Sequence, residues 1–172
     1  MKKNEVLLVD FNDNPIKNVD KISAHKTPKL HRAFSIFLVN GNKMLIQKRA
    51  KTKYHSPSLW ANACCSHPLS NNFFAEANTR LAEELGITQE LEFEELFSFI
   101  YFANLGNLFE FELDHVLISS YAGKIMLNQD EAEKFEWIEI PKLEKQMIKN
   151  PRKFAPWFLI CAPKVIKILK NR

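Results

Sequence analysis

Two short motifs place reactive side chains at the spacing of a β-strand. Glu110 and Glu112 stand two residues apart, so in a strand both carboxylates face the same side. Cys65 and His67 have the same spacing, with Cys64 facing the other side. The acidic motif alone is typical of a half-buried strand with a solvated acidic face. A Cys and a His on one face could be a nucleophile and its base, two metal ligands, or an acid and a ligand.

Two histidines upstream, His25 and His31, extend this set. Either could be an ordinary surface histidine. Together with His67 and the two carboxylates, they would form a five-ligand site for one divalent metal. Mixed imidazole and carboxylate ligands suit Zn²⁺, Mn²⁺ or Fe²⁺ better than a soft metal. Whether the five side chains meet in space is a question of tertiary structure.

Basic residues gather around one predicted polar loop, from Arg49 to Ser58. The set is Lys21, Lys48, Arg49, Lys51 and Lys53. Its ordinary interpretation is a solvated surface. The alternative is a clamp for a diphosphate, in which Arg makes bidentate contacts and Lys supplies point charges.

A second charged set, Glu76, Arg80 and Glu84, recurs at i, i+4 and i+8 on one predicted helix. Intrahelical pairing, worth a few tenths of a kcal/mol, explains such spacing by itself. The alternative is that Glu84 holds Mg²⁺ and Arg80 contacts phosphate.

The elements that must position these residues are strands on both sides of a central helix. The predicted strands are Val6–Asp10, Arg32–Val39, Lys43–Lys48, Leu91–Phe102, Leu108–Ser119 and Phe135–Ile140. Asn40-Gly41-Asn42 and Asn104-Leu105-Gly106-Asn107 predict two hairpin turns. The central helix begins after Asn71 or Asn72, ends at Gly86, and turns Phe73, Ala77, Leu81 and Leu85 toward the core.

Two more helices follow the sheet, one starting at Pro141 and one over Phe154–Leu169. We therefore expect an α/β or α+β sandwich, with a mixed central sheet flanked by helices. A chain of 172 residues suits a single domain, 1–172.

Composition restricts the possible partners and the compartment. The net charge of +4 is mild and spread along the chain, so it does not favour nucleic-acid binding. The longest apolar stretch, 154–163, is shorter than the roughly 20 residues of a membrane span. Three cysteines, two of them adjacent, are no disulfide framework, which favours the cytoplasm. We expect a monomer or a weak homodimer.

In this order the motifs resemble the type 1 isopentenyl-diphosphate isomerase family of the Nudix superfamily. The similarity runs from about Lys21 to Trp157. Its landmarks are Leu30-His31-Arg32-Ala33-Phe34-Ser35, Cys64-Cys65-Ser66-His67-Pro68, Glu83-Glu84-Leu85-Gly86-Ile87, Glu110-Phe111-Glu112-Leu113-Asp114 and Pro156-Trp157. The resemblance implies a Nudix-like fold and the conversion of isopentenyl to dimethylallyl diphosphate for isoprenoid biosynthesis, with a small prenyl diphosphate as the only partner.

The resemblance also implies roles for matching residues. The metal ligands are His25, His31, His67, Glu110 and Glu112, which would hold one Mn²⁺ or Zn²⁺ (or Mg²⁺). Cys65 and Glu112 match the acid and base, and Tyr101 is a relay beside them. Glu84 matches a ligand of the Mg²⁺ that accompanies the diphosphate. The diphosphate-binding positions are Lys21, Arg49, Lys53 and Arg80, and Trp157 lines the hydrocarbon pocket. No flavin is implied.

Two other classes of function remain as alternatives. A Nudix-type diphosphate hydrolase needs the consensus Gly-x5-Glu-x7-Arg-Glu-x-x-Glu-Glu-x-Gly. When the consensus is aligned on Gly86, its first four conserved positions fall on Cys65, Asn71, Thr79 and Arg80, which are residues of another type. Only Glu83, Glu84 and Gly86 match. Too few carboxylates remain for several activating metals. A non-catalytic binding module would not need Cys65. His55, His115, Cys64 and Cys161 receive no role.

Overall fold

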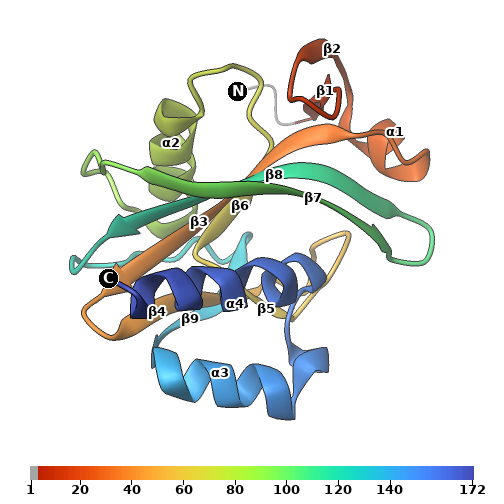
Figure 1. Ribbon diagram of the computed structural model, residues 1–172. Helices are drawn as coiled ribbons and strands as arrows, with labels where there is room; N and C mark the ends of the chain where they lie inside the picture. Colours follow the sequence, from red (N-terminus) through yellow and green to blue (C-terminus); the bar gives the residue numbers. More distant parts are fainter. Residues whose placement is uncertain (1–3) are drawn as a thin grey trace.

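The computed structural model describes residues 4–172, in which strands and helices follow one another as Figure 1 shows. The strands are β1 (Glu5–Val9), β2 (Pro15–Asp20), β3 (His31–Asn40), β4 (Lys43–Arg49), β5 (Trp60–Ala61), β6 (Cys64–Ser66), β7 (Glu94–Asn104), β8 (Phe109–Ser120) and β9 (Ala132–Glu139). The helices are α1 (Lys21–Lys26), α2 (Phe73–Leu85), α3 (Ile140–Lys149), the 3₁₀ turn η1 (Pro151–Lys153) and α4 (Pro156–Lys170).

Strand β3 organises the sheet. It runs parallel to β8, with His31 beside Glu112, and antiparallel to β6, with Ser35 beside Cys65. Strand β8 pairs in turn with β7, and β4 pairs with β9. Both β3 and β8 are buried over most of their length, as expected for strands covered on both faces. The sheet is therefore mixed, as predicted.

Helices cover the two faces of this sheet, with α2 on one side and α4 and α3 on the other (Figure 1). Successive residues of β8 divide between the two cores. Leu117 packs in the cluster with α2, and Val116 and Ile118 pack in the cluster with α4. Glu110 and Glu112 share the face of Val116, so they point to the α4 side. The α/β sandwich expected from the sequence is confirmed.

The acidic face of β8 is not solvated. Glu110 and Glu112 are 1% and 6% exposed. A solvated strand face, the ordinary interpretation of Glu-x-Glu, is therefore wrong. The reason is that elements distant in the sequence, among them α4 and the loop between β4 and β5, close over this side of the sheet.

Predicted boundaries of the longer elements hold to within a few residues. Gly41 and Gly86 have φ of 55° and 65°, the left-handed conformation that a hairpin turn and a helix end require. Asn72 is the N-cap of α2 but makes no side-chain capping bond. Strand β7 begins after the predicted Leu91, because Asn78 of α2 binds both the N–H and the C=O of Leu91.

Four short elements were not predicted: β2, α1, β5 and η1. Strand β6 was expected only as an extended segment that turns Cys65 and Cys64 to opposite sides. Most of β2 is exposed and lacks an apolar alternation. Helix α1 has only six residues, too few for a periodic pattern. The local signal for it is Asp20, whose Oδ1 accepts the N–H of Ser23 at 2.8 Å as an N-cap. None of the helices within residues 4–172 is long and apolar enough to cross a membrane.

Candidate active site

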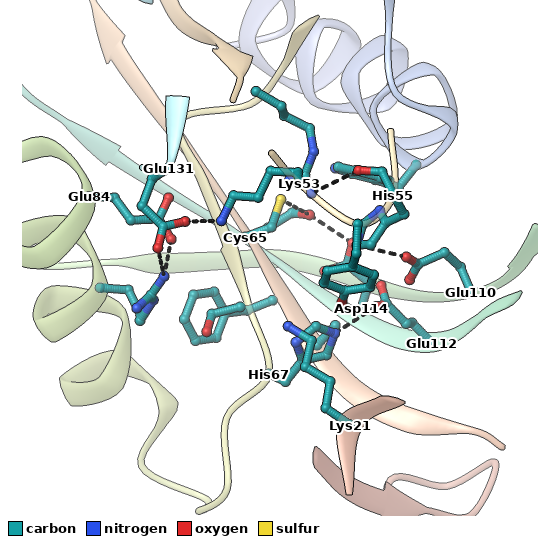
Figure 2. A pocket seen from close by; sticks show the side chains of 18 of the residues that line it. Lys21, Lys53, His55, Cys65, His67, Glu84, Glu110, Glu112, Asp114 and Glu131 are labelled. Atoms are coloured by element: carbon teal, nitrogen blue, oxygen red, sulfur yellow. Dashed lines mark hydrogen bonds and ion pairs between the residues drawn. The ribbon is translucent and has the colours of Figure 1, made fainter. Parts of the chain in front are cut away.

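One pocket, open to solvent, brings together residues from α1, α2 and α4 and from several strands. Figure 2 shows its lining side chains from close by. Its walls contain most of the predicted site residues: Lys21, Arg49, Lys53, Cys65, His67, Arg80, Glu84, Tyr101, Glu110, Glu112 and Trp157. Of the predicted basic set, Lys48 and Lys51 do not line it. Lys48 instead pairs with Glu133 at 2.8 Å.

His25 and His31 lie behind this wall with one ring nitrogen already committed. Nδ1 of His25 donates to the Lys21 carbonyl at 2.7 Å, and Nδ1 of His31 donates to the Lys29 carbonyl at 2.8 Å. Each ring therefore presents Nε2 as an acceptor. Both Nε2 atoms are buried and have no hydrogen-bond partner within the described residues. Such outer hydrogen bonds are how metal-binding histidines are oriented.

Four side chains converge at these nitrogens, and we call them the histidine–carboxylate cluster: His25, His31, His67 and Glu112. Their ligand atoms all lie within 4.8 Å of one another. Oε1 of Glu112 is 2.8 Å from Nε2 of His67 and 3.5 Å from Nε2 of His31. The parallel register of β3 and β8 causes this meeting, because it sets His31 beside Glu112. The set fits a divalent metal such as Zn²⁺ or Mn²⁺.

Burial keeps two of these rings in the uncharged form that binds metals. It lowers the pKa of His67 to about 3, with Lys21 adding to the effect. Burial also lowers the pKa of His25, assisted by the charge of His31. A metal ligand must be deprotonated, so the cluster is ready to bind at neutral pH.

Glu110, the fifth predicted ligand, lies at the edge of this cluster. Its Oε2 is 3.7 Å from Nε2 of His25. Its Oε1 is 3.1 Å from Nε2 of His55, and these three residues form a second group that could hold a metal. His55 received no role from the sequence. The only local signal was its place in the basic loop, two residues after Lys53.

The two carboxylates of β8 have opposite electrostatic environments. Burial and the neighbouring Glu112 raise the pKa of Glu110 well above its usual range. Burial also acts against the charge of Glu112, but the adjacent His31 ring, 3.5 Å away, and the hydrogen bond with His67 outweigh it and hold its pKa well below normal. Tyr101, beside Glu112 in the β7–β8 ladder, donates to Oε2 of Glu112 at 2.7 Å. Close carboxylates often divide in this way, one protonated and one ionised.

The Cys65 thiol faces the pocket, and Cys64 packs under α2 in the opposite core. Sγ of Cys65 donates to Oδ1 of Asn62 at 3.2 Å and lies 3.6 Å from Oγ of Ser35. Burial, together with the charge of Asp114, raises the pKa of Cys65 to about 12. The group is therefore a protonated thiol at neutral pH, suited to proton transfer rather than to nucleophilic attack.

Trp157, in the first turn of α4, forms part of the pocket wall. Its indole Nε1 donates to Oδ1 of Asn62 at 3.1 Å, the same atom that Cys65 contacts. The Arg49 guanidinium lies 5.2 Å from the centre of the indole ring. Asn62, which no sequence motif marks, thus links the thiol to the Trp157 indole. Its amide nitrogen donates to the carbonyls of Ile36 and Cys64.

The opposite part of the pocket holds an ion-pair network of Lys53, Arg80, Glu84 and Glu131, of which Glu84 and Glu131 lie at the left of Figure 2. Lys53 pairs with Glu131, and Arg80 pairs with Glu84 and lies 3.6 Å from Glu131. Burial raises the pKa of Glu84, although Arg80 opposes the shift. Glu131 was not predicted, because it lies in an irregular loop far from α2 in sequence.

Lys21 lies apart from this network, next to the histidine–carboxylate cluster. Its Nζ is 5.3 Å from the centre of the Tyr54 ring. Burial lowers the pKa of Lys21, against the attraction of Glu112 and Glu110. The predicted diphosphate-binding cations therefore reach the pocket from three elements: α1, the β4–β5 region and α2.

Comparison with known proteins identifies the family. The chain is 41% identical over 157 residues to isopentenyl-diphosphate Delta-isomerase of Serratia proteamaculans, covering 90% of this chain and 87% of that protein. It is 40% identical over 167 residues to isopentenyl-diphosphate Delta-isomerase 2 of Aromatoleum aromaticum, covering 95% and 87%. The chain belongs to the isopentenyl-diphosphate Delta-isomerase family. No family model matches it.

Solved structures show which fold this isomerase family member has. A MutT protein from Methanosarcina mazei Go1 superposes with a TM-score of 0.64 at 11% identity, over 83% of this chain and 96% of that one. A Nudix hydrolase from M. smegmatis, RenU, superposes with a TM-score of 0.56 at 13% identity, over 96% and 94%. The Nudix fold is confirmed, as is the predicted resemblance to the isomerases.

Proposed function

We propose that the chain converts isopentenyl diphosphate to dimethylallyl diphosphate by adding a proton at one carbon and removing another two bonds away. The observation that carries the proposal is the placement of Cys65 and Glu112 in one pocket. They come from β6 and β8, which pair with opposite edges of β3, and both project from the same face. Two proton-handling groups thus flank one space, as a protonation–deprotonation reaction requires.

The diphosphate would bind to cations already in the pocket wall. Lys53 is paired with Glu131 and Arg80 with Glu84, so phosphate oxygens would compete with these two carboxylates for the cations. Arg49 offers a guanidinium on the side of Trp157. Glu84 is the proposed ligand of the Mg²⁺ that accompanies the diphosphate, since Mg²⁺ binds through one or two carboxylates plus substrate phosphates.

The histidine–carboxylate cluster, with Glu110, would hold a second divalent metal, Mn²⁺ or Zn²⁺ (or Mg²⁺). The Nε2 atoms of His25 and His31, which have no hydrogen-bond partner among residues 4–172, support this assignment. When bound, the ion would fix the orientation of Glu112 and alter its proton affinity. Tyr101 holds the other oxygen of Glu112. No flavin takes part in the proposed reaction.

Protonation of an unactivated alkene produces a tertiary carbocation, and the pocket residues must tolerate it. Cys65 is a protonated thiol rather than a nucleophilic thiolate, so it is a poor trap for the cation. The indole of Trp157 can stabilise a nearby cation by up to about 2 kcal/mol. By microscopic reversibility, the group that donates the proton in one direction accepts it in the other.

Incubation with isopentenyl diphosphate and Mg²⁺ in D₂O, followed by NMR, tests the proposal. We expect dimethylallyl diphosphate with deuterium in a methyl group, because the incoming proton comes from an enzyme acid that exchanges with solvent. Phosphate release without label in the carbon chain would instead assign a diphosphate hydrolase. If neither product forms, the chain is a non-catalytic binding module.

Domain organisation, oligomeric state and cellular location complete the proposed function. We propose that residues 1–172 act as one domain, because residues from Lys21 to Trp157 line one pocket, and that the protein is a monomer or a weak homodimer. A cytoplasmic location is also proposed. The supporting argument is that Cys65 works only as a free thiol, and a reducing compartment preserves it.

A further inference from the structure

His55 lies in the loop between β4 and β5, with its ring enclosed by other aromatic rings. The centres of the Tyr54, Trp157 and His25 rings are 4.4, 5.7 and 6.1 Å away. Its side chain is 9% exposed. Its carbonyl accepts a hydrogen bond from Arg49 at 3.3 Å. Packing against these neighbouring rings therefore holds the His55 ring in place.

The edge of this ring that carries Nε2 faces Glu110, as the dashed line in Figure 2 marks. Nε2 is 3.1 Å from Oε1 of Glu110, within hydrogen-bonding distance. The other oxygen of Glu110, Oε2, lies 3.7 Å from Nε2 of His25. The two carboxylate oxygens thus face different partners, and only Oε2 faces the histidine–carboxylate cluster.

A separate second ion at His25, His55 and Glu110 is disfavoured by the chemistry of His25. Its Nδ1 already donates to the Lys21 carbonyl, which leaves one lone pair, on Nε2. That lone pair belongs to both groups of potential ligands, the cluster and the group with His55. One lone pair serves one ion, so the second group does not form an independent site.

We propose that His55 is a positioning residue for the metal centre: its Nε2–H donates to Oε1 of Glu110 and keeps Oε2 directed at the ion. The inference rests on the proposed function. Among the described residues Oε1 of Glu110 has no formed hydrogen bond, so the 3.1 Å approach of His55 Nε2 is the contact that would restrict its rotation once the hydrogen bond forms. Hydrogen bonds of this kind to metal ligands typically contribute 10–100-fold to metal affinity or activity. The His55 ring also packs against Trp157, so it contacts both a proposed metal ligand and the proposed hydrocarbon-binding residue.

Mn²⁺ binding to the metal-free protein tests this role without any assay of activity. The dissociation constant is measured by competition with a chelator, and the bound ion is observed by electron paramagnetic resonance. We expect His55→Phe, which keeps a ring but loses the donor, to raise the constant by about 10–100-fold. His55→Gln, whose amide can donate to Glu110, should recover most of the affinity.

His115→Phe is the matched control. His115 is also buried and bonded to carboxylates, at 2.7 Å from Glu95 and 3.1 Å from Asp13, but it does not line the pocket. We expect this variant to bind Mn²⁺ as the parent protein does. Thermal unfolding of each metal-free variant identifies any that fails to fold, and His55→Gln is the variant with the smallest change in shape.

The outcomes separate this inference from the proposed function. If His55→Phe binds Mn²⁺ normally and His67→Ala does not, the metal centre stands and the role of His55 is wrong. If His67→Ala binds normally, the metal centre itself is wrong, and this inference with it. A His55→Gln protein as weak as His55→Phe, with an altered resonance spectrum, would make His55 a direct ligand and overturn the positioning role.

Discussion

The histidine–carboxylate cluster and the ion-pair network share one pocket but satisfy their polar atoms in opposite ways. In the cluster, Nε2 of His25 and His31 are buried without hydrogen bonds within residues 4–172. In the network, Lys53 and Arg80 already have carboxylate partners. A buried polar atom without a hydrogen bond reduces the stability of the folded protein by about 1–3 kcal/mol, so a ligand that contacts these nitrogens should stabilise the cluster. The network is stable until a stronger anion replaces Glu131.

The two regions should therefore respond differently to substitution. Changes in or beside the cluster should remove chemistry or metal binding. Changes in the network should weaken substrate binding and leave the chemical step nearly intact.

Cys65→Ala should lower kcat by about 10²–10⁴-fold, the usual contribution of an acid–base group, with little change in substrate affinity. Cys64→Ala is the control, because Cys64 packs in the opposite core and should affect stability more than turnover. Steady-state kinetics of both variants checks the prediction. Equal losses of kcat in two folded proteins would mean that Cys65 has no special role.

His67→Ala should abolish stabilisation by Mn²⁺. At a hundred times its dissociation constant, the ion should add about 2.7 kcal/mol to the free energy of unfolding of the parent protein. Glu131→Gln, in the network, should keep the full increment. Chemical unfolding with and without Mn²⁺ measures both. Loss of the increment in Glu131→Gln alone would reverse the comparison between the two regions.

Acidification should destabilise the metal-free protein through His67. Its pKa is about 3 in the folded state and near 6.5 when unfolded. The unfolded chain therefore binds the proton first, so this stabilisation is complete above pH 6.5 and is lost as the pH falls toward 3. Between pH 7 and pH 5 the loss from this residue is on the order of 2 kcal/mol.

His67→Gln supplies the reference for this pH effect. The difference in unfolding free energy between parent and variant, measured in EDTA, should shrink as the pH falls from 7 to 5. The lowered pKa of Glu131 acts only below about pH 4.5, so it does not contribute in this window. A pH-independent difference would show that His67 is not held neutral by burial.

Lys53→Ala should raise KM with little effect on kcat. A charge-assisted contact contributes about 1.5–3 kcal/mol, and we expect the lower end because Glu131 already occupies Lys53 in the free protein. Lys48→Ala is the control, since Lys48 pairs with Glu133 outside the pocket. A fall in kcat with unchanged KM would contradict a role in binding.

The period of a β-strand was enough to separate Cys65 from Cys64 and to put Glu110 and Glu112 on one face. Turn residues with a local conformational requirement, such as Gly41 and Gly86, marked where elements end. The motifs, taken in order, also carried the family resemblance. All of these features depend on residues within a few positions of one another, which is why they can be recognised in one dimension.

Tertiary structure alone decided the rest. Asn62 joins Cys65 to Trp157, 95 residues away, and Glu131 meets Lys53 across 78 residues. No local sequence pattern marks such partners, because these contacts form only when distant strands, helices and loops pack together. His55 is the clearest case: in sequence it is one polar residue in a basic loop. Only the closing of that loop and α4 over β8 buries it, removes competing water and turns its nitrogen toward Glu110.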